Sequence, residues 1–407
     1  MAASKKNAQP PMDEVDAKRR EMMAQTRAFI KKATDQDPIG TRNGSWPHLQ
    51  SGAIAVDSLI GGTPILDGSG LVCPGYPRGR ITEIYGAESS GKTTLALAAA
   101  VQAQRAKQGV LYFDYENAIH HGYARSIGVN FDESYLSLFA PTTLEEGMKM
   151  LYIAIKQGVG LVVIDSVAAM VPKAELEKKL DDAAAIGVLA RSMSSVLPKM
   201  TQWLKGSPTV VIFINQVRAN ISKTSYGPGD DNTAGGKAVK FYASLRLKLT
   251  RIKSEFIEKV DPITLQKKKI PFGNVVQVKA VKNKMDGKQG HACEIFIRYG
   301  TGVDEYLSLV EAAVPRKIIL KRASAYDFEG ESFKGRDKLR SYLVSNPKAF
   351  EKLRDSVMQS LLSEAPTAVT EVDDDDIVSD MRKELDDDTL FDEAVDTTPE
   401  EVVSEGS

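Results

Sequence analysis

Short apolar runs alternate with helical stretches between about residues 51 and 300, and this alternation limits the possible folds more than any other feature of the chain. A fully apolar strand needs cover on both faces, so apolar runs separated by helices indicate a parallel sheet between two helical layers. The sequence therefore predicts an α/β fold with a mainly parallel, twisted sheet flanked by helices. The five runs are ITEIY (81–85), VLYFDYE (110–116), YLSLFA (135–140), LVVIDSV (161–167) and TVVIFINQV (209–217).

The pattern changes after residue 244, where three strand-like runs follow one another with no helical stretch between them. Consecutive strands of this kind pair antiparallel, so we expect an antiparallel extension of the same sheet. The three runs are LRLKLTRI (245–252), VVQVKAVKN (275–283) and CEIFIRY (293–299). From about residue 313 a compact segment follows, and its last helix, NPKAFEKLRDSVMQSLL, begins at the helix-starting pair Asn346 and Pro347.

The composition excludes several classes of protein. No run of about 18 uninterrupted apolar residues occurs, and the N-terminal MAASKKNAQPPMDEVDAKRR lacks the apolar core of a signal peptide. We therefore expect a protein that works in the cytoplasm without a membrane partner. The two cysteines, Cys73 and Cys293, are too few for a disulfide framework, and no cysteine and histidine cluster suggests a zinc site.

Charge is distributed unevenly along the chain. Residues 366–407 hold 16 Asp and Glu residues against Arg382 and Lys383, a net charge of −14, which leaves +13 on residues 1–365 of a chain whose total is −1. A basic body with an acidic tail is typical of a protein that binds a polyanion and carries its own competitor; the alternative is a tail that only adds solubility. Because the tail has few aromatic residues, we expect residues 366–407 to be disordered.

The octapeptide GAESSGKT, Gly86 to Thr93, fits the phosphate-binding pattern G-x-x-x-x-G-K-[ST]. It follows an apolar strand and opens an alanine-rich helix, so backbone N–H groups can curl around phosphates while the helix N-terminus adds its dipole. We expect Lys92 to reach the β- and γ-phosphates and Thr93 to ligate Mg²⁺. The sequence thus predicts a site for ATP and Mg²⁺, with phosphate-binding residues Gly86, Glu88, Ser89, Ser90, Gly91, Lys92, Thr93 and Thr94.

Polar side chains follow three other strands where each strand leaves the sheet. Asp165 ends LVVID and can hold a magnesium-bound water, or alternatively cap a turn. Glu116 lies just beyond VLYFD, where a carboxylate can accept a proton from an attacking water; Asp114 competes for that role. Gln216 ends FINQ, and its amide can bind a γ-phosphate and lose that partner after hydrolysis. We therefore expect one edge of the sheet to carry the catalytic groups, with Gln216 as a sensor.

Two polar stretches leave the sheet beside this edge. Residues 177–187 (EKKLDDAAAIG) come after the Asp165 strand, and residues 217–236, rich in Gly, Ser, Asn and Asp, follow Gln216. Long loops inside a compact domain are usually functional. A γ-phosphate at this edge could bias the order of both loops, which is the arrangement of a nucleotide switch.

Several strings resemble the bacterial RecA recombinase family: GRITEIYGAESSGKTT, LVVIDSVAAMVPKAELE, IFINQVRANIS, GGKAVKFYASLRL and VKNK. The likeness runs over roughly residues 50 to 362. It implies a DNA-dependent ATPase that forms a helical filament of like protomers on single-stranded DNA, binds ATP between neighbours, and exchanges strands with a homologous duplex in recombination and DNA repair. Single-strand-binding or mediator proteins are the further partners that the family would bring.

The resemblance also implies a division of the chain. It assigns residues 1–48 to an N-terminal oligomerisation helix, 49–312 to the ATPase core, 313–365 to a small α+β C-terminal domain and 366–407 to the acidic tail. Residues 13–33 have the composition of that outlying helix.

Further site residues follow from the resemblance alone. Lys282 and Lys284 of VKNK would reach across to the neighbour's γ-phosphate, as a charge clamp supplied in trans. Tyr123 would stack on adenine and Tyr306 would border the nucleotide. Phe241 would lie at the subunit interface. The DNA-binding residues would be Ile186, Arg191, Ser194, Arg218, Ile221, Gly235, Gly236 and Lys237, with sequence-tolerant, salt-sensitive binding.

The chain departs from the family pattern in several places. The stretch between Gly62 and Arg78 is longer, His120 stands where an Asp is usual, Lys237 replaces an Asn, and Leu307 replaces a Gly. These differences suggest a divergent branch. The main alternatives are a hexameric helicase of the same fold, which would close into a ring, and a non-catalytic protein that coats single strands.

Overall fold

The computed structural model describes residues 48–61, 65–67, 70–72, 74–177, 187–217, 233–260, 266–285 and 289–363. The predicted N-terminal helix, most of both predicted loops and the acidic tail lie outside these ranges, so those predictions stay untested. Internal contacts group residues 1–363 into one unit and residues 364–407 into another. Within the described ranges, no helix combines the length and the apolar character that crossing a membrane requires.

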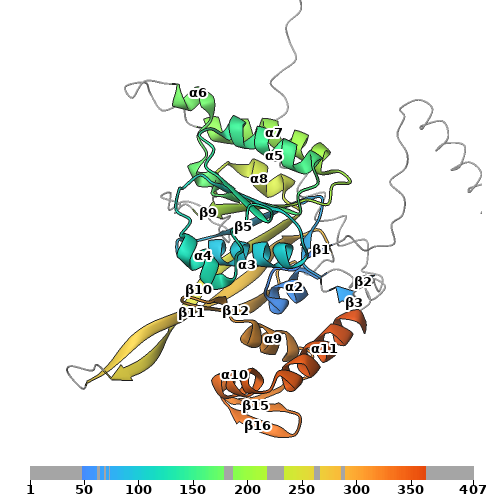
Figure 1. The fold of residues 1–407 in the computed structure, drawn as a ribbon, viewed down its shortest axis with the longest axis vertical. Coiled ribbons are helices and arrows are strands. Elements are labelled where there is room, and N and C mark those ends of the chain that lie inside the picture. Colours follow the sequence, from blue (N-terminus) through green and yellow to red (C-terminus); the bar gives the residue numbers. More distant parts are fainter. Residues whose placement is uncertain are drawn as a thin grey trace, which may run out of the picture. The chain divides into compact units, whose positions relative to one another are not determined.

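A sheet of nine strands forms the centre of the described part of the chain, in the order β13-β12-β11-β10-β5-β9-β8-β6-β7 (Figure 1). Strands β10, β5, β9, β8, β6 and β7 pair in parallel, and β11, β12 and β13 continue the sheet antiparallel. The predicted mainly parallel sheet with an antiparallel extension is therefore confirmed. The strands are β5 (Arg80–Gly86), β6 (Val110–Asp114), β7 (Leu136–Phe139), β8 (Leu161–Asp165), β9 (Val210–Gln216), β10 (Leu245–Val260), β11 (Lys267–Asn283), β12 (Ala292–Arg298) and β13 (Gly302–Val303).

Helices cover both faces of this sheet (Figure 1). One apolar cluster joins α2 (Ile54–Ile60), α3 (Lys92–Arg105) and α4 (His121–Ile127) to the first face, and a second joins α5 (Leu144–Lys156), α7 (Val188–Leu204) and α8 (Lys237–Tyr242) to the other. Alternate residues of one strand serve the two clusters: Val163 faces the first and Ile164 the second, and neither is exposed. Each fully buried side chain of this kind contributes about 1.5–3 kcal/mol. Shorter elements here are η1 (Val167–Ala169) and α6 (Lys173–Leu176).

Strands β10 and β11 extend well beyond the sheet as a two-stranded arm, which the yellow ribbon of Figure 1 shows leaving the core. The sequence predicted strands ending at residue 252 and starting at 275, but pairing continues to Ile257 with Ile270 and Val260 with Lys267. Lysines and glutamates interrupt the apolar pattern here, so the arm lacks the run of apolar residues by which a buried strand is recognised in a sequence. Phe256 and Val260 of the arm are 54% and 56% exposed.

The C-terminal part of the described chain packs three strands and two helices against α9 (Glu305–Ala313). Asp304 ties this part to the core, because its carboxylate pairs with Arg298, the last residue of β12, and with Arg340 of α10. The additional elements are β14 (Leu320–Arg322), β15 (Ala325–Phe328), β16 (Glu331–Lys334), α10 (Arg336–Ser345) and α11 (Pro347–Ser363). Two small pairs precede the core: β1 (His48–Leu49) with β4 (Tyr76–Pro77), and β2 (Ile65–Asp67) with β3 (Gly70–Val72).

Asp57 is an acidic side chain buried inside the first apolar layer. It is 3% exposed, and its Oδ1 accepts a hydrogen bond from the Ser51 backbone N–H at 2.7 Å. Burial raises the pKa of Asp57 to about 8. An unfolded aspartate ionises near about pH 4, so between these two values the folded state keeps a proton that the unfolded chain has lost. The contribution of Asp57 to the free energy of unfolding therefore falls as the pH rises from about 4 to about 8.

Substituting Asp57→Asn removes the titration but keeps the oxygen that accepts from Ser51. We expect the melting temperature of this variant to exceed that of the wild type at about pH 8 by more than at about pH 5. Differential scanning fluorimetry across this range measures the effect, with the exposed Asp355→Asn as control. Parallel pH profiles for wild type and Asp57→Asn would contradict a protonated Asp57.

Candidate nucleotide and nucleic-acid site

The phosphate-binding loop connects β5, which ends at Gly86, to α3, which begins at Lys92. Gly91 has a φ of 92°, and a Cβ at this position would lie 2.3 Å from Ile297 Cδ1, so the loop's close packing requires glycine. Lys92 Nζ donates to the carbonyl oxygens of Gly86 at 3.2 Å and Ala87 at 2.8 Å. Burial lowers the pKa of Lys92, while the charges of Asp165, Glu116 and Glu88 oppose that shift. The lysine thus lies within the loop and close to three carboxylates.

Thr93 and Asp165 lie together beside this loop. Thr93 Oγ1 donates to Asp165 Oδ2 at 2.9 Å, and the Tyr112 hydroxyl donates to the same oxygen at 2.6 Å. Burial raises the pKa of Asp165, against the hydrogen bonds from Tyr112 and Thr93. A hydroxyl and a carboxylate are oxygen ligands of the kind that Mg²⁺ prefers, so this pair fits the predicted metal role.

The structure separates Glu116 from its competitor Asp114. Asp114 Oδ1 and Oδ2 accept hydrogen bonds from the backbone N–H groups of Ala118 at 3.2 Å and Ile119 at 2.9 Å, so this carboxylate holds the turn after β6. Glu116 is exposed beyond the strand, and Ser166 donates to its Oε1. Glu116 is therefore the carboxylate that can reach a substrate.

Gln216 completes the edge. It pairs in register with Gly86, the first residue of the phosphate-binding loop, and its Nε2 donates to Glu116 Oε1 at 3.0 Å. Asp165 pairs in register with Asp114. Lys92, Thr93, Glu116, Asp165 and Gln216, which stand far apart in the sequence, thus come together at the carboxyl ends of four parallel strands.

A pocket opens beside the phosphate-binding loop. Tyr123 borders it, with its hydroxyl 2.8 Å from Thr94 Oγ1. Sequence reasoning missed the opposite wall, which consists of Arg251, Asn274, Ile297 and Tyr299. The available signal was an aromatic residue directly after CEIFIR, and Tyr299 hydrogen-bonds Asn274 Oδ1 at 3.2 Å.

Tyr306 lies elsewhere, because helix α9 turns it toward the C-terminal elements. Its ring centroid is 4.8 Å from that of Phe350, and the Arg340 guanidinium lies 5.6 Å from its ring. The neighbouring Leu307 is buried with Val275 and Phe296. Tyr306 is therefore not among the residues that line the pocket beside the phosphate-binding loop, whereas Tyr299 is.

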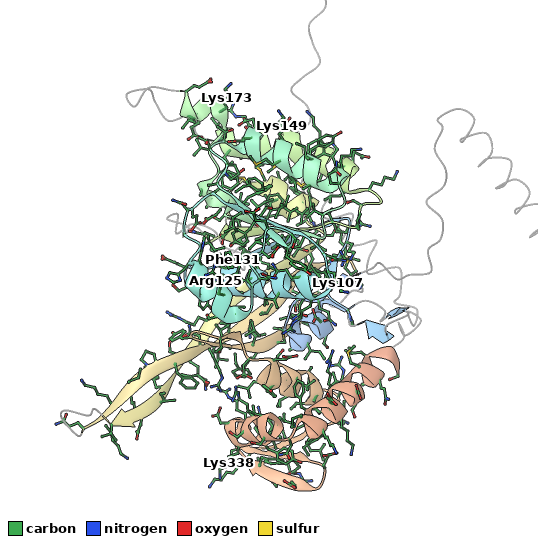
Figure 2. The ribbon with its side chains drawn as sticks, in the orientation of Figure 1. Lys107, Arg125, Phe131, Lys149, Lys173 and Lys338 are labelled. Carbon is green, nitrogen blue, oxygen red and sulfur yellow. The ribbon has the colours of Figure 1, made fainter. Side chains whose placement is uncertain are left out.

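Helix α4 presents Tyr123 to the pocket and is held at both ends. His120 caps it, since its Nδ1 accepts from the Tyr123 backbone N–H at 3.0 Å. In Figure 2, Arg125 of α4 and Phe131, which follows this helix, lie side by side, with the guanidinium 5.1 Å from the ring centroid. His120 thus has a structural role as the N-cap of α4, independent of any contact with a nucleotide base.

The described ends of the two predicted loops meet on the other face of the sheet. A Cβ on Gly236, before α8, would lie 2.8 Å from Ala190 Cβ of α7, and a Cβ on Gly235 would lie 3.1 Å from Val167 Cγ1. Among the predicted DNA-binding residues, Arg191, Ser194 and Lys237 are exposed next to these ends. Ile186, Arg218 and Ile221 fall outside the described residues.

Lys282 lies near the end of β11 and Lys284 directly follows this strand, and neither lines the pocket of its own chain. Lys282 Nζ donates to the carbonyls of Lys240 at 2.7 Å and Phe241 at 2.9 Å, at the last turn of α8. Burial, together with Lys284 and Arg246, lowers the pKa of Lys282 to about 8. Phe241 is 68% exposed.

A phosphate-binding loop after β5, an acid at the end of β8, a carboxylate just beyond β6 and an amide at the end of β9 are the arrangement typical of P-loop nucleotide-binding proteins. A family model for the RecA N-terminal domain matches residues 39–304. Protein RecA of Corynebacterium glutamicum (strain R) is 38% identical over 332 residues, covering 81% of each chain. Protein RecA of Leptospira biflexa is 39% identical over 304 residues, covering 73% of this chain and 74% of that one. The crystal structure of the RadB recombinase aligns at a TM-score of 0.44 with 21% sequence identity. The alignment covers 63% of this chain and 99% of that one. The family model and the two relatives show that this chain belongs to the RecA family of recombinases.

The positions of Tyr299 and Tyr306 give a test of the nucleotide pocket. We expect Tyr299→Ala to weaken binding of a fluorescent ATP analogue by about tenfold, since a stacked aromatic ring contributes about 1–3 kcal/mol. Tyr306→Ala should leave this affinity unchanged and lower the melting temperature, because its ring packs on Phe350. Fluorescence titration and thermal melting separate the two effects. Equal loss of affinity in both variants would contradict the placement of Tyr306.

Proposed function

We propose that this protein is a DNA-dependent ATPase that assembles into a helical filament on single-stranded DNA and pairs that strand with a homologous duplex for strand exchange. Membership of the RecA family supports the proposal, and so does the predicted site, whose parts lie at one edge of the sheet. ATP is the substrate and a second copy of the chain is the neighbour in the filament.

The observation that carries the proposal is the hydrogen bond between Gln216 Nε2 and Glu116 Oε1 at 3.0 Å. This hydrogen bond joins two residues with different roles. Glu116 is the carboxylate best placed to activate water, and Gln216 carries the side-chain amide at the point where the second loop begins. A γ-phosphate entering this edge would compete for the same amide. Binding and hydrolysis of ATP would therefore change the position of Gln216 and, through it, the loop that follows.

Each residue of the edge has one task in this chemistry. Lys92 would turn from the carbonyls of Gly86 and Ala87 to the β- and γ-phosphates, and the loop's N–H groups would bind phosphate oxygens. Thr93 and Asp165 would hold Mg²⁺, which when bound neutralises phosphate charge. Glu116 would accept a proton from the attacking water. Lys282 and Lys284 of the next protomer would add positive charge at the γ-phosphate.

DNA would be held by the paired ends of the two loops. Exposed Arg191 and Lys237 would pair with phosphates, and Gly235 and Gly236 would let the DNA backbone approach closely. Ser194, Arg218, Ile186 and Ile221 complete the proposed surface. Such contacts read no base edges, so binding should tolerate any sequence and weaken as salt is raised.

The decisive measurement is ATP turnover titrated with single-stranded DNA. We expect DNA to stimulate turnover by the wild type, Lys92→Ala to lose nucleotide-dependent DNA binding, and Glu116→Gln to bind ATP and DNA while turnover falls about 10²–10⁴-fold. Phosphate release and DNA anisotropy report the two properties separately. Full strand exchange by Lys92→Ala would refute the assignment, and electron micrographs of closed rings on DNA would favour a hexameric helicase.

The seam between protomers can be tested by mixing two inactive variants. Glu116→Gln and Lys282→Ala each lack one group, but in a mixed filament an intact Glu116 of one protomer can face an intact Lys282 of the next. Equal, random mixing should restore about one quarter of wild-type turnover, because each intact group is present at half the positions. If Lys282 acted on its own chain's nucleotide, the mixture would stay inactive.

A further inference from the structure

Three buried polar side chains cluster inside the sheet close to the nucleotide edge. Glu83 of β5 and Asn215 of β9 are 0% exposed, and Arg246 of β10 is 6% exposed. Asn215 Nδ2 donates to Glu83 Oε1 at 2.8 Å, and Arg246 Nε pairs with Glu83 Oε2 at 2.5 Å. Arg246 Nη2 has no hydrogen-bond partner among the described residues. Burying an ion pair costs desolvation free energy that incomplete bonding does not recover, so stability alone does not account for the cluster.

The Asn215 amide joins the two ends of the second loop. Its Oδ1 accepts from the backbone N–H of Gln216 at 2.9 Å, and its Nδ2 donates to the carbonyl oxygen of Ala234 at 3.0 Å. A backbone bridge between Val217 and Thr233 lies directly beyond these contacts. An amide offers one acceptor and two N–H donors, and all three are used here, by Gln216, Ala234 and Glu83.

The same cluster extends in two directions, toward the predicted ATP site of its own chain and toward Lys282, which is expected to reach the γ-phosphate of the neighbouring protomer. On one side, Gln216 reaches Glu116 through its own amide at 3.0 Å. On the other side, Arg246 pairs in register with Lys282, whose Nζ holds the last turn of α8, the helix that follows the second loop. The entry and the exit of the loop are thus connected to the groups expected to sense the nucleotide.

We propose that Asn215 is a positioning residue that makes the entry and the exit of the second loop move as one unit when Gln216 exchanges Glu116 for a γ-phosphate. This inference rests on the proposed function. The ion pair of Glu83 with Arg246 fixes the orientation of the amide, because a rotated amide would turn its oxygen toward the Glu83 carboxylate. A displacement at Gln216 then passes through Asn215 to Ala234 and on to Gly235 and Gly236, where DNA is expected to bind.

The test compares DNA affinity in two nucleotide states. Anisotropy of a labelled oligothymidylate is measured with a non-hydrolysable ATP analogue and with ADP, for the wild type, Asn215→Ala, Asn215→Ser and the control Gln104→Ala. Gln104 is a suitable control because its amide also bridges backbone groups, donating to Asn130 O at 2.7 Å and accepting from Asn130 N at 2.9 Å, on α3 away from the loops. Asn215→Ser keeps a hydroxyl near Glu83 and so limits any loss of stability.

We expect the ratio of the two DNA affinities to fall about tenfold in both Asn215 variants, while binding of a fluorescent ATP analogue and DNA-independent turnover stay unchanged. Gln104→Ala should keep the wild-type ratio. Adding Gln216→Ala to Asn215→Ala should cause no further loss, because the two residues act in series. Asn215 variants that keep the ratio, or that lose ATP binding in parallel with it, would overturn the role of Asn215. A wild type without nucleotide-dependent DNA binding would instead overturn the proposed function itself.

Discussion

The parallel register of β5, β6, β8 and β9 is the constraint on which the candidate site depends. Because Gly86 pairs with Gln216 and Asp114 with Asp165, the residues that leave each strand arrive at the same edge. A slip of one residue would turn each of these side chains to the opposite face of the sheet. The apolar parts of the strands fix the register by burial on both faces, and the polar residues at their ends provide the chemistry. In each strand, the apolar residues therefore serve packing, and the polar residues at the carboxyl end serve function.

Much of this edge could be predicted from sequence, because parallel strands place their carboxyl ends together whatever their order. Two of the apolar runs, to residues 116 and 167, extend two residues past their strands, which end at Asp114 and Asp165, in agreement with the expected place of Glu116 just beyond its strand and of Asp165 at the end of its strand. After these residues the regular strand pairing ends. The Tyr115 backbone N–H donates to the Asp165 carbonyl oxygen, and Val167 begins a short 3-10 helix. The preference for Glu116 over Asp114 followed from the depth of the two residues, because Asp114 belongs to the strand and Glu116 lies beyond it.

Other features could not be predicted because they combine residues from distant parts of the chain. The pocket wall formed by Arg251, Asn274 and Tyr299 exists only because β10, β11 and β12 pair beside the phosphate-binding loop. The expectation for Tyr306 came from the resemblance alone, and the packing of α9 against α11 places its ring on Phe350. The β10–β11 arm escaped notice because solvated strands carry charged residues at positions where a core strand carries apolar ones.

The bridge between Val217 and Thr233 has a consequence for the entropy of DNA binding. Bringing the ends of a flexible segment together has an entropic cost that depends only weakly on its length. Here the sheet has already brought together the ends of residues 218–232 when the core folds. A ligand that contacts both Val217 and Thr233 would therefore meet these two ends already paired, and the closure term would not appear in its affinity.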